Sequence, residues 1–306
     1  MVPSFHDAAA PEHRETQYFE MFVNRGIYHQ GWTAVTRHST PWVMGDLVAI
    51  DDDVWELYGP DDWTQARDIA GQNPAKLAEL QRLFLIEAAK YNVLPLDDRR
   101  VERFNADLAG RPQLIQGKSQ LMFGGMGRLS ENSVLVTKNK SHAITANLTV
   151  PDGSAEGVII AQGGAFAGWC IYAKGGTPKY CYNLLGLKRF TIEGDRAIPP
   201  GDHQIRVEFD YDGGGLAKGA TITLYLDGDK VGDGRLDATV PMVFPGDETT
   251  DVGHDAGTGV SDEYATGDNE FTGTVHWVQI DIDENAEDFD HLITAEERWR
   301  VAMARQ

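Results

Sequence analysis

Arg25, His29 and His38 are the side chains in this sequence best suited to contact a tetrahedral anion. Arginine presents a planar fork of N–H donors, and histidine donates one further hydrogen bond when its other ring nitrogen is held by a partner. We therefore treat the three as candidate substrate-contacting residues. The alternative is that they pack between domains.

No nucleophilic arrangement is complete in the sequence. Cys170 and Cys181 lack the neighbouring Pro and Arg of a modified-cysteine site, and neither a Gly-x-Ser-x-Gly elbow nor a His-Glu-x-x-His helix occurs. The runs Gly124-Gly125 and Gly213-Gly214-Gly215 lack the Lys-Ser/Thr ending of a phosphate loop, which predicts turns. No catalytic residue is assigned.

Two acidic segments contain residue types that can bind metal ions. Asp51-Asp52-Asp53 brings no further ligands with it, which favours a solvated turn. Asp281-x-Asp283-x-Asn285 begins like a calcium loop, but Ala286 and Leu292 stand where that loop needs Gly and Glu. No metal ligand is predicted.

Four aromatic residues, Trp169, Tyr172, Tyr180 and Tyr182, form a second candidate group. Their rings could stack on sugars, although aromatic residues in half-buried strands more often pack in the core. Glycan contact and core packing both remain open.

Composition limits the partners. The 306 residues carry a formal charge of −20, which disfavours nucleic acid and anionic membranes. Two cysteines, no secretory signal and no long apolar run suit the cytoplasm.

The elements that would position these residues change character near residue 110. Strands are predicted within 18–22, 26–37 and 54–58, followed by a helix over 74–91 with Asn73 as its cap. Leu77, Leu80, Phe84, Ala88 and Tyr91 recur at three- and four-residue spacing, and the helix is expected to cover the sheet with this face.

From residue 111 to 283, short strands with Gly-rich turns predict a two-sheet β-sandwich. Gln204, Arg206 and Glu208 alternate with apolar residues and are expected on a wet face. The turns Gly175-Gly176 and Asp227-Gly228 predict hairpins, and the first places Cys170 opposite Cys181. Pro178 could shift that register, because it cannot donate a ladder hydrogen bond.

The remaining segments flank these units. Residues 1–17 are expected to be flexible, and 284–306 to be an acidic linker followed by a helix over 295–305. Thr294 and Glu297 form a capping box, and Leu292, Trp299 and Val301 are expected to dock the helix. The predicted class is α+β, mainly β.

Three sequence segments, in order, resemble the C-terminal subdomain of bacterial arylsulfatases: YFEMFVNRGIYHQGWTAVTRH, DDDVWELYG and NPAKLAELQRLFLIEAAKYNVLPLDDR. The resemblance continues through GGMGRLSENSV to HLITAEERWRVAMARQ, while the phrases around WCIYAKGG and LYLDGDKVG resemble concanavalin-like sandwiches. The family's Cys-x-Pro-Ser-Arg segment is absent from this sequence.

The resemblance implies the C-terminal portion of a sulfuric ester hydrolase. It would cover the active-site side of a catalytic domain outside this sequence, and calcium and formylglycine would belong to that domain. Arg25, His29 and His38 would then face a sulfate ester, and this chain alone would be inactive. The alternative function is a stand-alone carbohydrate-binding or protein-interaction sandwich.

Overall fold

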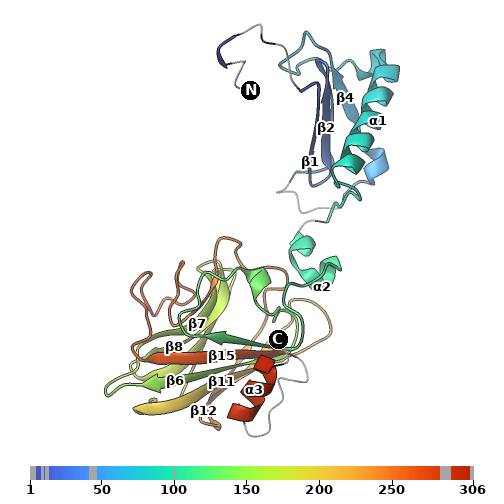
Figure 1. Ribbon diagram of the computed structural model, residues 1–306. Coiled ribbons are helices and arrows are strands. Elements are labelled where there is room, and N and C mark those ends of the chain that lie inside the picture. The colour runs from blue at the N-terminus through green and yellow to red at the C-terminus, as the bar shows by residue number, and fades with distance from the viewer. Residues whose placement is uncertain are drawn as a thin grey trace. The chain divides into compact units, whose positions relative to one another are not determined.

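The computed structural model describes residues 5–7, 10, 14–40, 47–99, 101–282 and 291–303. The chain forms two compact units, Met1–Arg103 and Phe104–Gln306 (Figure 1). Each has its own hydrophobic core. The division falls before residue 110, where the sequence changes character. No described helix has the length and apolar character needed to cross a bilayer.

The first unit is an antiparallel sheet with a helix packed on one face. Its strands, in order across the sheet, are β1 (Thr16–Met21), β2 (Asn24–His29), β3 (Trp32–Thr36) and β4 (Trp55–Tyr58). Helix α1 (Pro74–Lys90) packs three buried side chains, Leu80, Phe84 and Ala88, on this sheet. Their spacing of four residues places them on one helical face, with Leu77 partly buried beside them. The predicted apolar stripe is thus confirmed except for Tyr91, which follows the helix and is 47% exposed.

Two local features of this unit differ from the sequence-based prediction. Segment 26–37 holds parts of two strands, because Gln30 and Gly31 take positive φ values of 47° and 86° and reverse the chain. The prediction that the Asn73 side chain caps α1 is wrong. Its Nδ2 atom instead donates to Ile69 O at 3.2 Å, which turns the amide away from the helix N–H groups.

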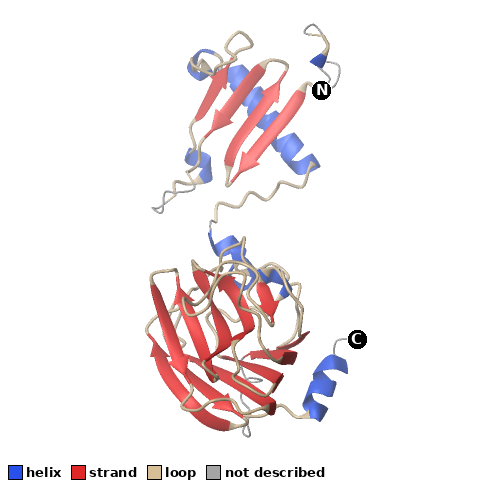
Figure 2. Cartoon of the chain, turned by 90° about the vertical axis from the view of Figure 1, so that its left-hand side faces the viewer, coloured by secondary structure: helices blue, strands red, loops and turns tan. Residues whose placement is uncertain are grey.

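The second unit confirms the predicted two-sheet sandwich (Figure 2). One antiparallel sheet has five strands in the order β10-β9-β8-β7-β14, and the other has six in the order β13-β12-β11-β6-β15-β5. The bounds are β5 (Ser119–Phe123), β6 (His142–Val150), β7 (Gly157–Gly164), β8 (Ala167–Lys174), β9 (Thr177–Leu184), β10 (Lys188–Glu193), β11 (Gly201–Tyr211), β12 (Ala220–Leu226), β13 (Asp229–Leu236), β14 (Thr250–Val252) and β15 (Thr274–Ile282).

Short helical segments lie between these strands and in the first unit. They are the 3-10 turns Ile50–Asp52, Ala70–Gln72, Val101–Phe104 and Glu131–Ser133, and helix α2 (Ala106–Ala109).

The two predicted hairpins form as expected. Gly175 and Gly176 take φ values of 59° and 82°, and Asp227 and Gly228 take 54° and 85°. These are the signs that a type I′ turn requires. The first turn sets Cys170 opposite Cys181, both buried free thiols.

Pro178 keeps this register. It pairs with Ala173, one position out from the closing pair of a two-residue hairpin, where no ladder bond to the neighbouring strand is made. Its carbonyl accepts from Gly194 N at 2.9 Å.

The last described element is α3 (Ala295–Met303), which lies outside the two sheets (Figure 2). The predicted capping box is confirmed: Glu297 N donates to Thr294 Oγ1 at 3.3 Å, and Thr294 N donates to Glu297 Oε2 at 2.8 Å. The residue that docks this segment differs from the prediction. Ile293 is buried, whereas Trp299, which was expected to dock the helix, is 65% exposed. The predicted acidic linker and the Val301 side chain lie outside the described residues.

Candidate functional site

The outer face of the six-stranded sheet carries a continuous group of polar and aromatic side chains. On β6, β11 and β15 the residues in between, such as Ile144, Val207 and Ile280, enter the core. Because side chains alternate along a strand, their neighbours face outward. We call this outer face the polar floor. Its polar and aromatic members are Ser119, Phe123, Thr145, Asn147, Gln204, Arg206, Glu208, Tyr225, Trp277, Gln279 and Asp281, and the apolar Leu121 and Ala143 lie among them.

Strand register arranges the polar floor in rows. Phe123, Trp277, Asn147 and Gln204 follow one another across β5, β15, β6 and β11. The next row holds Gln279, Thr145, Arg206 and Tyr225. The strands hold these groups in fixed order. From β5 to β12 the polar floor spans about 19 Å, four interstrand spacings of about 4.8 Å each.

Arg206 lies at the centre of the polar floor and is only 1% exposed. Its Nε donates to Glu208 Oε1 at 2.9 Å, and its Nη1 donates to Thr145 Oγ1 at 3.0 Å. These contacts offset the cost of burying the guanidinium. The expectation that Arg206 faces water is therefore wrong. Burial also raises the pKa of the neighbouring Tyr225 to about 12, helped by the Glu208 charge.

A segment near the C-terminus covers part of the polar floor. We call residues 291–303 the C-terminal strap. Ile293 exchanges two hydrogen bonds with the Gln204 side chain, and His291 contacts Glu208 and Tyr225. Farther along, α3 approaches β5. Gln279 Oε1 is buried on the polar floor without a hydrogen-bond partner among the described residues.

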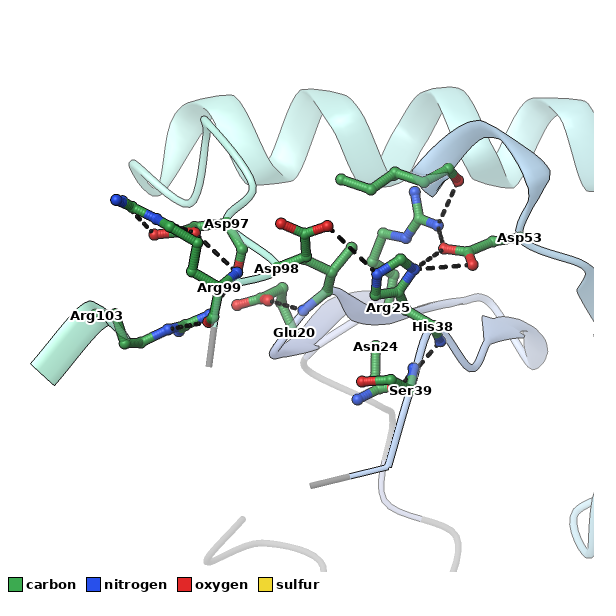
Figure 3. Close-up of polar contacts among 12 residues, drawn as sticks. Glu20, Asn24, Arg25, His38, Ser39, Asp53, Asp97, Asp98, Arg99 and Arg103 are labelled. Carbon is green, nitrogen blue, oxygen red and sulfur yellow. Dashed lines mark hydrogen bonds and ion pairs between the residues drawn. The ribbon is translucent and has the colours of Figure 1, made fainter. Parts of the chain in front are cut away.

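In the first unit the structure brings Arg25 and His38 together around Asp53 (Figure 3). His38 Nδ1 lies 3.0 Å from Asp53 Oδ1, and Arg25 forms a short ion pair with the same carboxylate. On the other side of the ring, His38 Nε2 lies 3.7 Å from Asp98 Oδ2. The imidazole is thus held between two carboxylates.

Asn24 fixes the backbone beside this cluster. Its Oδ1 atom accepts from the N–H groups of His38 and Ser39, at 2.9 and 3.2 Å (Figure 3). Around His38, Arg25, Asp53 and Asp98 bring together β2, the turn after Ile50 and the segment at Asp98. Since the His38 side chain is fully buried, the arrangement serves packing better than contact with a substrate.

His29 lies apart from this cluster. It stands at the opposite end of β2 from Arg25, about 13 Å away along an extended strand. Its Nδ1 atom pairs with Thr16 Oγ1 at 2.8 Å. The candidate trio is therefore not assembled into one site.

A groove of about 870 Å³ runs beside the cluster, lined by residues that include Thr36, Arg37, His38 and Glu56. The three residues of the acidic triplet Asp51-Asp52-Asp53 differ in exposure. Asp51 and Asp52 are exposed, whereas the Asp53 side chain is 1% exposed. The solvated-turn prediction thus fails for Asp53, whose charge is balanced by Arg25. Among the described residues, no group of three or more His, Cys, Asp or Glu side chains is placed to hold a metal ion. Asp283 and Asn285 lie outside the described residues.

The four candidate glycan aromatics are all buried. Trp169, Tyr180 and Tyr182 belong to the sandwich core, and Tyr172 packs under the loop that carries Val260 and Tyr264. Trp169 Nε1 donates to Gln162 Oε1 at 3.0 Å, and the Tyr182 hydroxyl oxygen accepts from Val240 N at 2.8 Å. The geometry supports the core-packing alternative, since no ring offers a free face.

The sequence did not predict the polar floor as a candidate site. Its outward residues match the alternation of any strand, and the C-terminal strap that covers them lies more than 80 positions beyond Glu208. The one feature of the sequence that could have indicated this face is the close spacing of the planar polar side chains of Gln204, Arg206 and Glu208 on a strand that pairs with the strand of Tyr225.

Comparison with known proteins finds no matching family model and no matching curated protein. Among solved structures, the chain is similar to the CBM40 module of Ruminococcus gnavus IT-sialidase bound to α2,3 sialyllactose, at 14% identity and TM-score 0.38, covering 57% of this chain and 96% of that one. It is also similar to the LG1-3 region of the laminin α2 chain, at 12% identity and TM-score 0.35, covering 56% and 32%.

A third similar structure is the heptameric SAP-like pentraxin from Limulus polyphemus, at 12% identity and TM-score 0.29, covering 57% and 79%. None of the comparisons points to a sulfatase C-terminal region. The prediction that this chain is a sulfatase C-terminal region is therefore wrong. The hydrolase function and the catalytic partner domain that the resemblance implied are not supported either.

Proposed function

We propose that the sandwich unit is a carbohydrate-binding module and that the polar floor is its binding face. The observation that carries this proposal is the composition of the polar floor. One guanidinium, two carboxylates, amides and hydroxyls lie on adjacent strands beside Phe123 and Tyr225, which keep exposed surface, while Trp277 lies among them but is only 3% exposed.

These groups match the chemistry of a sugar. Carboxylates, amides and guanidinium groups supply paired acceptors and donors for vicinal hydroxyls, and aromatic faces pack on the apolar C–H side of the ring. Strands hold such groups more rigidly than loops do, which lowers the entropy cost of binding. An oligosaccharide could contact the members that keep exposed surface, which include Phe123, Asn147, Gln204, Glu208 and Tyr225.

The β5 edge of the polar floor offers a test that leaves the core intact. Phe123 is 55% exposed at this edge, and Phe166 is 71% exposed on a hairpin of the five-stranded sheet. Binding of the full chain to immobilised lactose, chitotriose and α2,3-sialyllactose is measured for Phe123→Ala and for the matched control Phe166→Ala. We expect Phe123→Ala to weaken binding about five- to tenfold, as loss of one aromatic contact of about 1 kcal/mol would do, and Phe166→Ala to leave it unchanged.

Two outcomes would contradict this proposal. One is that none of the sugars binds, even when the C-terminal strap is released as described below. The other is that Phe166→Ala abolishes binding while Phe123→Ala does not.

A further inference from the structure

The C-terminal strap meets the polar floor through a compact set of contacts. The His291 ring stacks on Tyr225, with centroids 4.1 Å apart and planes inclined by 14°. Its Nδ1 atom lies 2.7 Å from Glu208 Oε1. Two residues later, Ile293 N donates to Gln204 Oε1 at 2.9 Å and Ile293 O accepts from Gln204 Nε2 at 2.8 Å.

These three kinds of contact are the ones a pyranose would make. A flat group stacks on an aromatic ring, a polar group meets a carboxylate, and a donor–acceptor pair meets a side-chain amide. A sugar ring could place its C–H face on Tyr225, one hydroxyl on Glu208, and a donor–acceptor pair on Gln204. The C-terminal strap therefore occupies its place on the polar floor in the manner of a ligand.

Residues of the sheet fix the side chains that the C-terminal strap contacts. Arg206 Nε donates to Glu208 Oε1 and thereby fixes the carboxylate. At the end of β12, Asp227 Oδ1 accepts from Gln204 N at 2.8 Å, which fixes the backbone that carries the amide. Tyr225 stands opposite Arg206 in the strand register. Preorganised groups of this kind suit a binding subsite.

Charge indicates the class of sugar. Glu208 and Asp281 bring two carboxylates to the polar floor, while Arg206 brings one guanidinium that already bonds to Glu208. The whole chain carries −20 as well. An anionic sugar would meet repulsion here, whereas a neutral or amino sugar would not.

We propose that Tyr225, Gln204 and Glu208 form a subsite for a neutral or amino pyranose, and that the C-terminal strap fills this subsite until a sugar displaces it. This inference rests on the proposed function and locates it. Because only molecules with the C-terminal strap released can bind at this place, the apparent affinity is reduced by the fraction that is released.

The test uses the full chain with point changes in the C-terminal strap. The double variant His291→Ala/Ile293→Ser removes the stacked ring and the buried anchor. Trp299→Ala is the matched control, because Trp299 lies on the same segment and is 65% exposed. Calorimetric titration with lactose, chitotriose and sialyllactose should show at least about tenfold tighter binding of a neutral or amino sugar for the double variant, and no change for Trp299→Ala.

A third variant identifies the subsite. Adding Tyr225→Leu to the double variant should remove the gain, and circular dichroism checks that the sandwich remains folded. Equal affinities for the parent chain and the double variant, with sugar still bound, would overturn the inference and leave the proposed function standing. Preference for sialyllactose would overturn the sugar class. If neither protein binds any sugar, both the proposed function and this inference fail.

Discussion

At the scale of single residues, surroundings decide what a side chain can do. His38 and His142 are both buried, yet one is held between carboxylates and the other is enclosed by the core. Burial lowers the pKa of His142 to about 4, although its Nδ1 atom lies 3.1 Å from Lys140 O. The ring also stacks on Phe209 at 4.4 Å.

His142 should make the sandwich sensitive to acid. The unfolded chain binds a proton at a histidine pKa of about 6.5, whereas the folded chain does so only near 4. As the pH falls between these two values, the free energy of unfolding should decrease by up to about 1.4 kcal/mol per pH unit, about 3 kcal/mol in total. Above the unfolded pKa this group has no effect.

Urea unfolding of His142→Phe across this pH range checks the prediction, with the exposed His276→Phe as the control. The variant should have a shallower pH dependence than the parent chain, and the control should not. Identical slopes for parent and His142→Phe would rule out the assignment.

Residue patterns predicted only part of the candidate site. The alternation of Gln204, Arg206 and Glu208 correctly places them on the outer face. It could not predict that Arg206 is buried, because the covering segment is distant in sequence. Nor could spacing separate His29 from His38, since the turn at Gln30-Gly31 directs them to different ends of the sheet.

At the scale of elements, turn chemistry gave the most reliable predictions. Gly175-Gly176 fixes the register that sets Cys170 opposite Cys181, and the Thr294–Glu297 capping box marks the start of α3. Both depend on backbone needs within a few residues. Contacts formed only in three dimensions were not predictable in this way, and Trp299 is exposed although its apolar character suggested docking.

Gly124 should be essential where β5 joins the six-stranded sheet. A Cβ atom at this position would lie 1.9 Å from Val275 O, next to the irregularity in the β15–β6 pairing. Gly124→Ala must therefore shift backbone, and we expect it to lower the free energy of unfolding by about 1–3 kcal/mol.

Gly246→Ala is the matched control, because a Cβ atom there would meet nothing within 4 Å. Hydrogen exchange should show faster exchange of β5 amides in Gly124→Ala only. Equal stability of the two variants would show that the strand edge adapts at little cost.

At the scale of the whole molecule, the chain consists of two units with separate cores. The sandwich closes its own core between two sheets, so we expect it to fold without the first unit. Scanning calorimetry of residues 104–306 should reproduce one of the transitions of the full chain at the same temperature. Loss of cooperative unfolding in the shortened chain would show that the first unit is required.

The central claim is that carbohydrate binds to the outer face of the six-stranded sheet. An amide-resolved NMR titration of the full-length His291→Ala/Ile293→Ser variant with chitotriose or lactose tests it most directly. We predict shift changes concentrated at Gln204, Arg206, Glu208 and Tyr225, extending toward Asn147 and Trp277. Changes confined to the five-stranded sheet or to the first unit, or no changes with either sugar, would contradict the claim.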